Sequence, residues 1–179
     1  MEYTTFDKIK SRDFVKKMIG ILNDEIDNSD KLVEELCVVF DIDGTLINPR
    51  TDTLIKPVFE FYQYCKSINI QIIIITARPG HEDNIKWTIE MLKKHNIETD
   101  KLNFMRPDLY HSPDTFSQQK SYKAEARTRI LETYDILMSF GDMPFDIGPE
   151  CNVGVVVAED ESENYINHYI VEYKETSEL

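Results

Sequence analysis

The chain has 179 residues, the size of one domain, and its 41% hydrophobic and 30% charged residues are typical of a soluble globular protein. A net charge of −13 argues against tight, nonspecific binding to nucleic acid, because phosphate contacts need clustered lysine and arginine. The longest strongly apolar run, residues 72–75, is far too short to span a bilayer. The N-terminus shows no secretory pattern, and the three scattered cysteines form no metal or disulfide pattern, so we expect a cytoplasmic protein without a membrane partner.

The first segment in chain order, residues 4–35, has a helical pattern with an apolar stripe formed by Val15, Met18, Ile19, Leu22 and Ile26. Such stripes usually dock on their own domain, and a cap or a homodimer contact is the alternative. We therefore expect a helical extension, residues 1–35, packed on a core of residues 36–179.

Five short apolar runs follow, separated by helical patterns. The expected strands are 36–40, 70–75, 101–105, 136–140 and 153–157, and the expected helices are 53–67, 82–95, 119–133 and a last one at 162–173. Runs rich in Ile and Val without polar alternation suit a sheet covered on both faces. Strand–helix alternation implies right-handed crossovers. The sequence predicts an α/β fold, a three-layer Rossmann-like sandwich with a mainly parallel five-stranded sheet.

In such a sheet, ligands bind beyond the carboxyl ends of the strands. The first strand runs directly into Asp41-Ile42-Asp43-Gly44-Thr45. Residues two apart in extended chain point the same way, so both carboxylates can face one point. Gly44 permits a tight turn. A divalent cation would offset the repulsion between the two acids. Because an apolar strand leads directly into the motif, a functional site is favoured over a surface Asp-Gly turn.

Two further clusters offer groups for an anion. Thr76 ends the second strand and can donate a hydroxyl hydrogen bond to phosphate. Arg78 could pair with phosphate or serve the structure. Lys123 stands near the start of a helix, where the helix dipole favours anions, and Lys120 is the competing choice.

The fourth strand ends in Gly141-Asp142, with Asp146 four residues later. These acids can supply oxygen ligands to magnesium. No Gly-rich loop ending in Gly-Lys-Ser/Thr is present, so a P-loop enzyme is disfavoured. The four histidines are scattered in the sequence and are expected at surface or capping positions: His81, His95, His111 and His168.

In this order the motifs resemble those of the haloacid dehalogenase (HAD) superfamily. The run from Asp41 to Thr45 is similar to its first motif, Thr76 to its second, Lys123 to its third, and Asp142 with Asp146 to its fourth. Residues 122–127, followed by 140–142, resemble the acid phosphatase branch, class B and plant storage-type, subfamily IIIB. Residues 105–107 fit that branch too.

This resemblance implies a magnesium-dependent phosphatase. Asp41 would attack phosphorus and form an aspartyl-phosphate, and Asp43 would act as general acid and base. The implied metal ligands are Asp41, Asp43 through its backbone carbonyl, Asp142, and Asp146 as ligand or supporting partner. The implied phosphate-binding groups are Thr76, Lys123 and the backbone near Gly44 and Ala77.

The segments between these motifs, residues 42–75 and 77–122, are too short for a large cap domain. We expect an open site, or one covered by the N-terminal helices, the 106–119 loop or a second subunit. Aromatic residues in that loop, Tyr110 and Phe116 with His111, could stack on a base or anchor the loop.

The expected substrate is a small phosphorylated metabolite or a nucleotide. A polynucleotide or protein phosphate is the alternative: residues 105–108 bear some likeness to polynucleotide 3′-phosphatase domains, although the acidic charge weighs against nucleic acid. A non-catalytic binding or storage protein is a third hypothesis, which the intact motifs disfavour.

Overall fold

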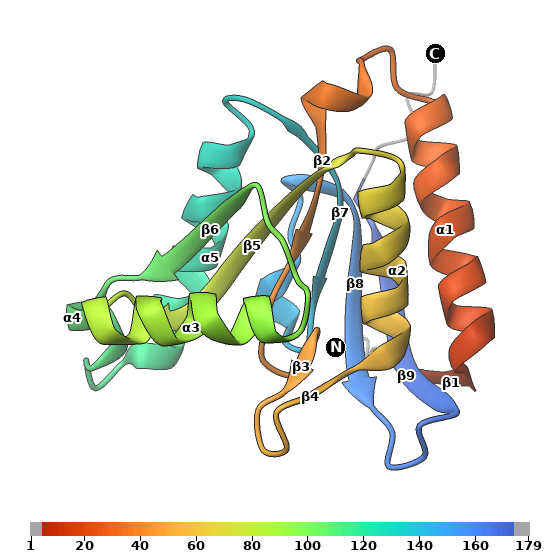
Figure 1. Ribbon diagram of the computed structural model, residues 1–179. Coiled ribbons are helices and arrows are strands. Elements are labelled where there is room, and N and C mark those ends of the chain that lie inside the picture. The colour runs from red at the N-terminus through yellow and green to blue at the C-terminus, as the bar shows by residue number, and fades with distance from the viewer. Residues whose placement is uncertain (1–4, 174–179) are drawn as a thin grey trace.

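A computed structural model describes residues 5–173 and places one seven-stranded sheet at the centre of the molecule (Figure 1). In spatial order its strands are β1 (Asp7–Lys10), β9 (Tyr165–Glu172), β8 (Cys151–Glu159), β7 (Asp135–Gly141), β2 (Leu36–Phe40), β5 (Gln71–Pro79) and β6 (Lys101–Met105). The α-helices are α1 (Ser11–Asp27), α2 (Lys56–Ser67), α3 (Glu82–Lys94), α4 (Pro107–Tyr110) and α5 (Thr115–Ile130).

The five strands from β8 to β6 are mutually parallel, which confirms the predicted parallel core. β2 is buried at all five of its residues. A strand that is buried on both faces needs apolar residues throughout, which is why this run shows no polar alternation.

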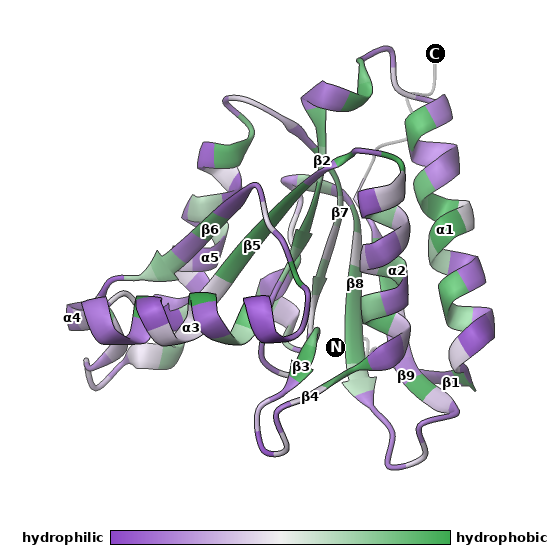
Figure 2. Cartoon of the chain, viewed as in Figure 1, coloured by the Kyte–Doolittle hydropathy of each residue, from purple (hydrophilic) through white to green (hydrophobic). Residues whose placement is uncertain are grey.

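Helices cover both faces of the sheet, so the predicted three-layer α/β/α sandwich is confirmed. Along β2, Val38 and Phe40 belong to the core under α1, α2 and α3, whereas Cys37 and Val39 belong to the core under α5. Successive side chains of a strand point to opposite faces, and this assigns the two sets. Green apolar segments run along the central strands in Figure 2.

The helix predicted over 162–173 is wrong, because the chain forms strand β9 there, antiparallel to β8. Ile166 and His168 are each 1% exposed, with less buried residues between and after them, which is the period-two pattern of a strand. β9 and β1 extend the predicted five-stranded sheet to seven.

The N-terminal segment also differs from an all-helical one. Residues 7–10 form β1, which pairs with β9, before α1 begins at Ser11. Phe14, Met18 and Leu22 of α1 are fully buried in the main core. The N-terminal segment is therefore integrated into the sheet and its packing.

Short elements replace a cap over the carboxyl edge of the sheet. Residues 42–55 hold a small hairpin of β3 (Ile47–Asn48) and β4 (Thr53–Leu54), and the expected 106–119 loop holds α4 and the first turn of α5. Across residues 5–173, no helix combines the length and the apolar character needed to cross a membrane.

Candidate active site

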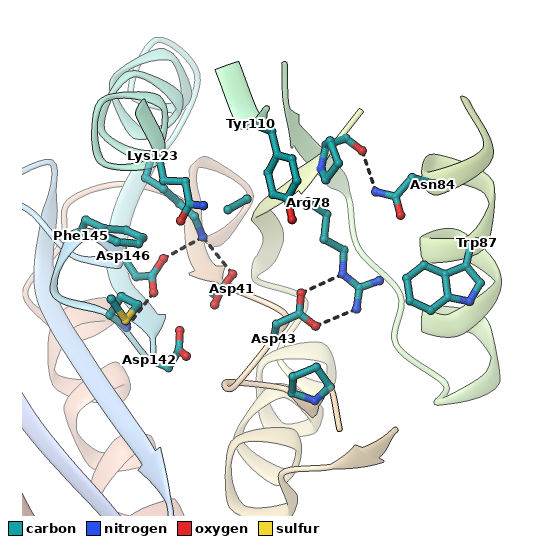
Figure 3. Close-up of a pocket in the computed structure, with 15 residues that line it drawn as sticks. Asp41, Asp43, Arg78, Asn84, Trp87, Tyr110, Lys123, Asp142, Phe145 and Asp146 are labelled. Carbon is teal, nitrogen blue, oxygen red and sulfur yellow. Dashed lines mark hydrogen bonds and ion pairs between the residues drawn. The ribbon is translucent and has the colours of Figure 1, made fainter. Parts of the chain in front are cut away.

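Four of the predicted site residues converge at the carboxyl edge of the sheet (Figure 3). Asp41 follows β2, Asp142 follows β7, Asp146 ends the short 3-10 turn Pro144–Asp146, and Lys123 comes from α5. They line one cavity of about 570 Å³. Since the carboxyl ends of parallel strands meet at one edge, distant parts of the sequence build this site together.

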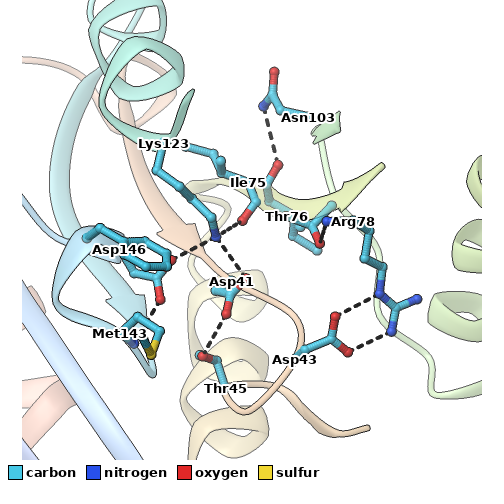
Figure 4. Close-up of polar contacts among 12 residues, drawn as sticks. Asp41, Asp43, Thr45, Ile75, Thr76, Arg78, Asn103, Lys123, Met143 and Asp146 are labelled. Carbon is cyan, nitrogen blue, oxygen red and sulfur yellow. Dashed lines mark hydrogen bonds and ion pairs between the residues drawn. The ribbon is translucent and has the colours of Figure 1, made fainter. Parts of the chain in front are cut away.

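The Lys123 ammonium lies at the centre of a buried ion-pair network (Figure 4). Its Nζ is 2.9 Å from Asp41 Oδ1, 2.7 Å from Asp146 Oδ1 and 2.8 Å from the carbonyl oxygen of Ile75. The side chain is 2% exposed, and its two carboxylate partners raise the pKa of Lys123 against the opposing effect of burial. Lys123 therefore stays charged beside Asp41.

Asp41 has an electrostatically perturbed carboxyl group. Burial raises the pKa of Asp41 well above its ordinary value, Lys123 opposes that shift, and the charges of Asp146 and Asp142 add to it. The Thr45 hydroxyl donates a long hydrogen bond of 3.4 Å to Asp41 Oδ2. A carboxylate in this position gains from any further positive charge.

Carboxylate oxygens of Asp41, Asp142 and Asp146 lie within 4.8 Å of one another. Burial and the charge of Asp146 raise the pKa of Asp142 to about 6. One lysine faces three acids, and an all-oxygen donor set is what hard divalent cations prefer. The residues present therefore fit a divalent metal ion.

Two glycines make room for these acids. Gly44 has φ +77°, and a Cβ built on it would lie 2.3 Å from Asp142 Oδ2. A Cβ on Gly141 would lie 1.9 Å from the Cβ of Asp146. Any larger residue at either position would displace a carboxylate. The Gly44 N–H donates to the carbonyl oxygen of Ile47 at 2.8 Å, and the phosphate role predicted for the backbone near Gly44 stays a prediction.

Asp43 lies in the same cavity but faces Arg78 instead of the carboxylate cluster (Figure 4). Arg78 Nε donates to Asp43 Oδ2 at 2.8 Å and Nη2 donates to Asp43 Oδ1 at 2.7 Å. This is a bidentate pair, the most specific geometry available to arginine and a carboxylate. The side chain of Asp43 is therefore separate from the metal cluster, and its backbone carbonyl is the part that the resemblance assigns to metal.

Two residues of α3 also contact the Arg78 guanidinium. Its guanidinium lies over the ring of Trp87, 4.8 Å from the centroid, and Nη1 donates to Thr88 Oγ1 at 3.2 Å. The register of β5 against β6 shifts between Ile75 and Pro79. Arg78 lies within this irregular stretch, and such irregularities can re-aim a side chain. The structure thus shows Arg78 engaged with an acid of the cavity.

The remaining predicted phosphate-binding residues differ in whether they reach the cavity. Ala77 lines the cavity, whereas Thr76 is 1% exposed and its Oγ1 accepts the Arg78 N–H at 3.1 Å. Of the two candidate lysines, Lys123 is buried at the site and Lys120 is exposed on α5. The phosphate role of Thr76 stays a prediction.

The sequence did not predict a role for Arg127, which supports the loop that carries Asp146. It donates to Glu150 Oε1 at 2.7 Å, to the Phe145 carbonyl at 2.9 Å and to the Ile147 carbonyl at 3.3 Å. Its spacing of four residues from Lys123 was the available signal, since residues four apart share a helix face.

Aromatic side chains form part of the cavity wall. Trp87 and Tyr110 line it, and Trp87 is 57% exposed. Phe116 instead packs edge-on against Phe145, with ring centroids 5.2 Å apart. Of the aromatic residues expected near the site, Tyr110 therefore reaches the cavity, and Trp87 is an addition from α3.

The sequence matches the model of one protein family, described as HAD superfamily, subfamily IIIB (acid phosphatase), over residues 46–167. This match begins just after the motif that holds Asp41 and Asp43. No curated protein matches the sequence.

A chain in the solved structure of the Pnkp1/Rnl/Hen1 RNA repair complex has a similar fold, with a TM-score of 0.51 and 21% identity. The alignment covers 66% of this chain and 39% of that one, so this chain spans well under half of that relative's length. The family match covers most of this chain and agrees with its three-layer fold. The chain belongs to the acid phosphatase family of the HAD superfamily, subfamily IIIB.

Proposed function

We propose that this phosphatase hydrolyses its substrate in two steps through an aspartyl-phosphate on Asp41. The observation that carries the proposal is the position of Asp41, which lines the cavity while Lys123 and two further acids surround it. An Asp41 oxygen attacks phosphorus, and the bond from phosphorus to the leaving oxygen breaks. Lys123 fixes the orientation of the nucleophile and offsets charge on the phosphoryl oxygens.

Asp43 serves as general acid and then as general base. In the first step it gives a proton to the leaving oxygen. In the second step it takes a proton from the water that attacks the aspartyl-phosphate, which releases inorganic phosphate and restores Asp41. The bidentate contact with Arg78 aims the Asp43 carboxylate from a fixed direction, and one of its two hydrogen bonds opens when Asp43 carries the proton.

The ion we propose at the carboxylate cluster is Mg²⁺. Asp41 and Asp142 would hold it together with the Asp43 backbone carbonyl. Asp146 supports this set through its contacts with Lys123 and with the Met143 N–H at 3.0 Å. When bound, the ion would offset the negative charge of the phosphoryl group and of the nucleophile.

The substrate we propose is a small phosphorylated metabolite or a nucleotide. A cavity of about 570 Å³ suits a molecule of that size, and Trp87 and Tyr110 give its wall the flat surfaces on which a base can stack. A polynucleotide phosphate is the second candidate. The short elements around the site favour it, and the net charge of −13 opposes it.

Phosphate release from nucleotides, sugar phosphates and phosphorylated oligonucleotides, with Mg²⁺ and with chelator, tests this function. We expect Mg²⁺-dependent release that is fastest with small substrates and abolished in Asp41→Asn. The matched control is Lys120→Ala, which changes an exposed lysine of the same helix and should retain activity, whereas Lys123→Ala should not. Release that persists in Asp41→Asn or in chelator would overturn the proposed mechanism.

A further inference from the structure

A pair of exposed histidines lies outside the machinery described above. The Nε2 atoms of His81 and His111 are 3.0 Å apart, and their ring centroids are 5.2 Å apart. Thirty residues separate them in the sequence, and they come from different elements: His81 precedes α3 and His111 follows α4. The two Nε2 atoms lie at hydrogen-bonding distance from each other, close enough for one ion to take the place of the proton between them.

We propose that His81 and His111 together bind a divalent transition-metal ion, of the class of Zn²⁺ or Ni²⁺. Zinc–nitrogen bonds are about 2.0–2.1 Å long, so two neighbouring ligands of one ion sit roughly 2.9–3.4 Å apart. The Nε2 separation of 3.0 Å falls in that range. Imidazole nitrogen suits Zn²⁺, Ni²⁺ and Cu²⁺, whereas the all-oxygen cluster at Asp41 suits harder ions.

The backbones of the two histidines are fixed relative to each other. The Gly80 N–H donates to the Met105 carbonyl at 2.8 Å, which ties the segment before His81 to the end of β6. The His81 carbonyl accepts the Ile85 N–H at 2.8 Å, and the His111 N–H donates to the Pro107 carbonyl at 3.1 Å. A site whose backbone is already ordered loses less entropy when it binds an ion.

The environment also favours a cation. Both rings are exposed, so water can complete the coordination shell of an ion held by two protein ligands. Glu82 and Asp83 follow His81 in the first turn of α3, and the whole chain carries a charge of −13. This negative field raises the local concentration of divalent cations.

A bound ion would connect two walls of the catalytic cavity. Pro79 and Tyr110 both line that cavity, and Tyr110 directly precedes His111, whose ring it meets edge-on at 5.1 Å. An ion at the histidine pair would therefore restrain Tyr110 relative to the segment that carries Arg78. The pair does not touch the Asp41 cluster, so binding there can be measured independently of catalysis.

Calorimetric titration of the full chain with Ni²⁺, in excess Mg²⁺ that fills the oxygen site, tests this proposal. We expect one Ni²⁺ to bind the parent, and His81→Asn and His111→Asn each to lower that affinity by about tenfold or more, since one imidazole cannot chelate. The double variant should bind Ni²⁺ at least as weakly as either single one. His95→Asn is the matched control: His95 pairs with Asp52, and its loss should leave the affinity unchanged.

Proton NMR gives a second readout. Paramagnetic Ni²⁺ should broaden the imidazole signals of His81 and His111 before those of His95 and His168. The proposal is overturned if the parent binds no Ni²⁺ in excess Mg²⁺, if His81→Asn binds like the parent, or if His95→Asn alone abolishes binding.

Discussion

Arg78 holds Asp43 through two hydrogen bonds, so the direction of that carboxylate depends on one guanidinium. The same guanidinium lies over Trp87 and donates to Thr88. With its donors directed at protein groups, Arg78 would act as a positioning residue for Asp43, the acid and base proposed above. A direct contact of Arg78 with substrate phosphate would require this arrangement to break.

Arg78→Lys should therefore lower kcat and leave KM nearly unchanged. Lysine keeps the charge but cannot make the bidentate contact, and a misplaced catalytic group costs up to about 100-fold in rate. Steady-state kinetics with one substrate across a range of pH measures the effect.

Arg106→Lys is the control, since Arg106 pairs with Asp108 through the same two donor atoms on the exposed surface. It should behave like the parent. An Arg78→Lys enzyme with raised KM and unchanged kcat would show that Arg78 binds the substrate instead.

Asp41 and Asp142 were predictable because each follows a strand whose pattern is local in the sequence. Lys123 was predicted near the start of a helix, and this placement is wrong, because α5 begins at Thr115 and carries Lys123 in its middle. The partner of Arg78 was not predictable. Asp43 lies 35 residues away from it, and the choice of that contact depends on Trp87, which α3 brings to the site.

At the scale of elements, helix α5 contributes two residues that shape the site. One face presents Lys123 to the acids, and Arg127, one turn later, holds the loop after β7 through three hydrogen bonds. The side chain of Arg127 is 4% exposed and that of its partner Glu150 is 15% exposed. Removing one member of a buried ion pair leaves the other charge without compensation.

Arg127→Met should lower the free energy of unfolding by about 3 kcal/mol, because Glu150 and two carbonyls lose their donor. Urea denaturation followed by circular dichroism measures this loss. Arg129→Met, an exposed change on the same helix, should stay within about 0.5 kcal/mol of the parent. Equal stability of the two variants would contradict the supporting role of Arg127.

The central strands β2 and β7 were predictable because a strand that is buried on both faces has a nearly continuous run of apolar residues. Strand β9 was not predictable, because its less buried residues include polar ones and its sequence is also compatible with a helix. Its strand form depends on pairing with β8 on one side and β1 on the other, and neither partner is visible in the local pattern.

At the scale of the whole molecule, the acid cluster links metal binding to pH and stability. The pKa of Asp142 is raised to about 6 in the folded chain, compared with about 3.9 for an unperturbed aspartate. The folded state thus binds this proton more tightly than the unfolded state. The resulting stabilisation is fully present below the unfolded pKa and is lost as pH rises through about 6.

Without Mg²⁺, the difference in stability between the parent and Asp142→Asn should therefore move against the parent as pH rises from about 4 to about 6. Added Mg²⁺ should stabilise the parent more at neutral than at acidic pH, because the ligand must be deprotonated. Thermal melting of both proteins with and without Mg²⁺ measures both effects. An equal response of Asp142→Asn to Mg²⁺ would place the metal elsewhere.

The most direct test of the whole account is a rapid-quench experiment on Asp43→Asn with 4-nitrophenyl phosphate. This leaving group departs without a proton, so Asp41 should still be phosphorylated, whereas hydrolysis of the aspartyl-phosphate lacks its base. We expect a burst of one nitrophenol per chain and a phosphoryl group on the peptide that contains Asp41, with neither in Asp41→Asn. Steady turnover without a burst, or a phosphoryl group on another residue, would contradict Asp41 as the nucleophile.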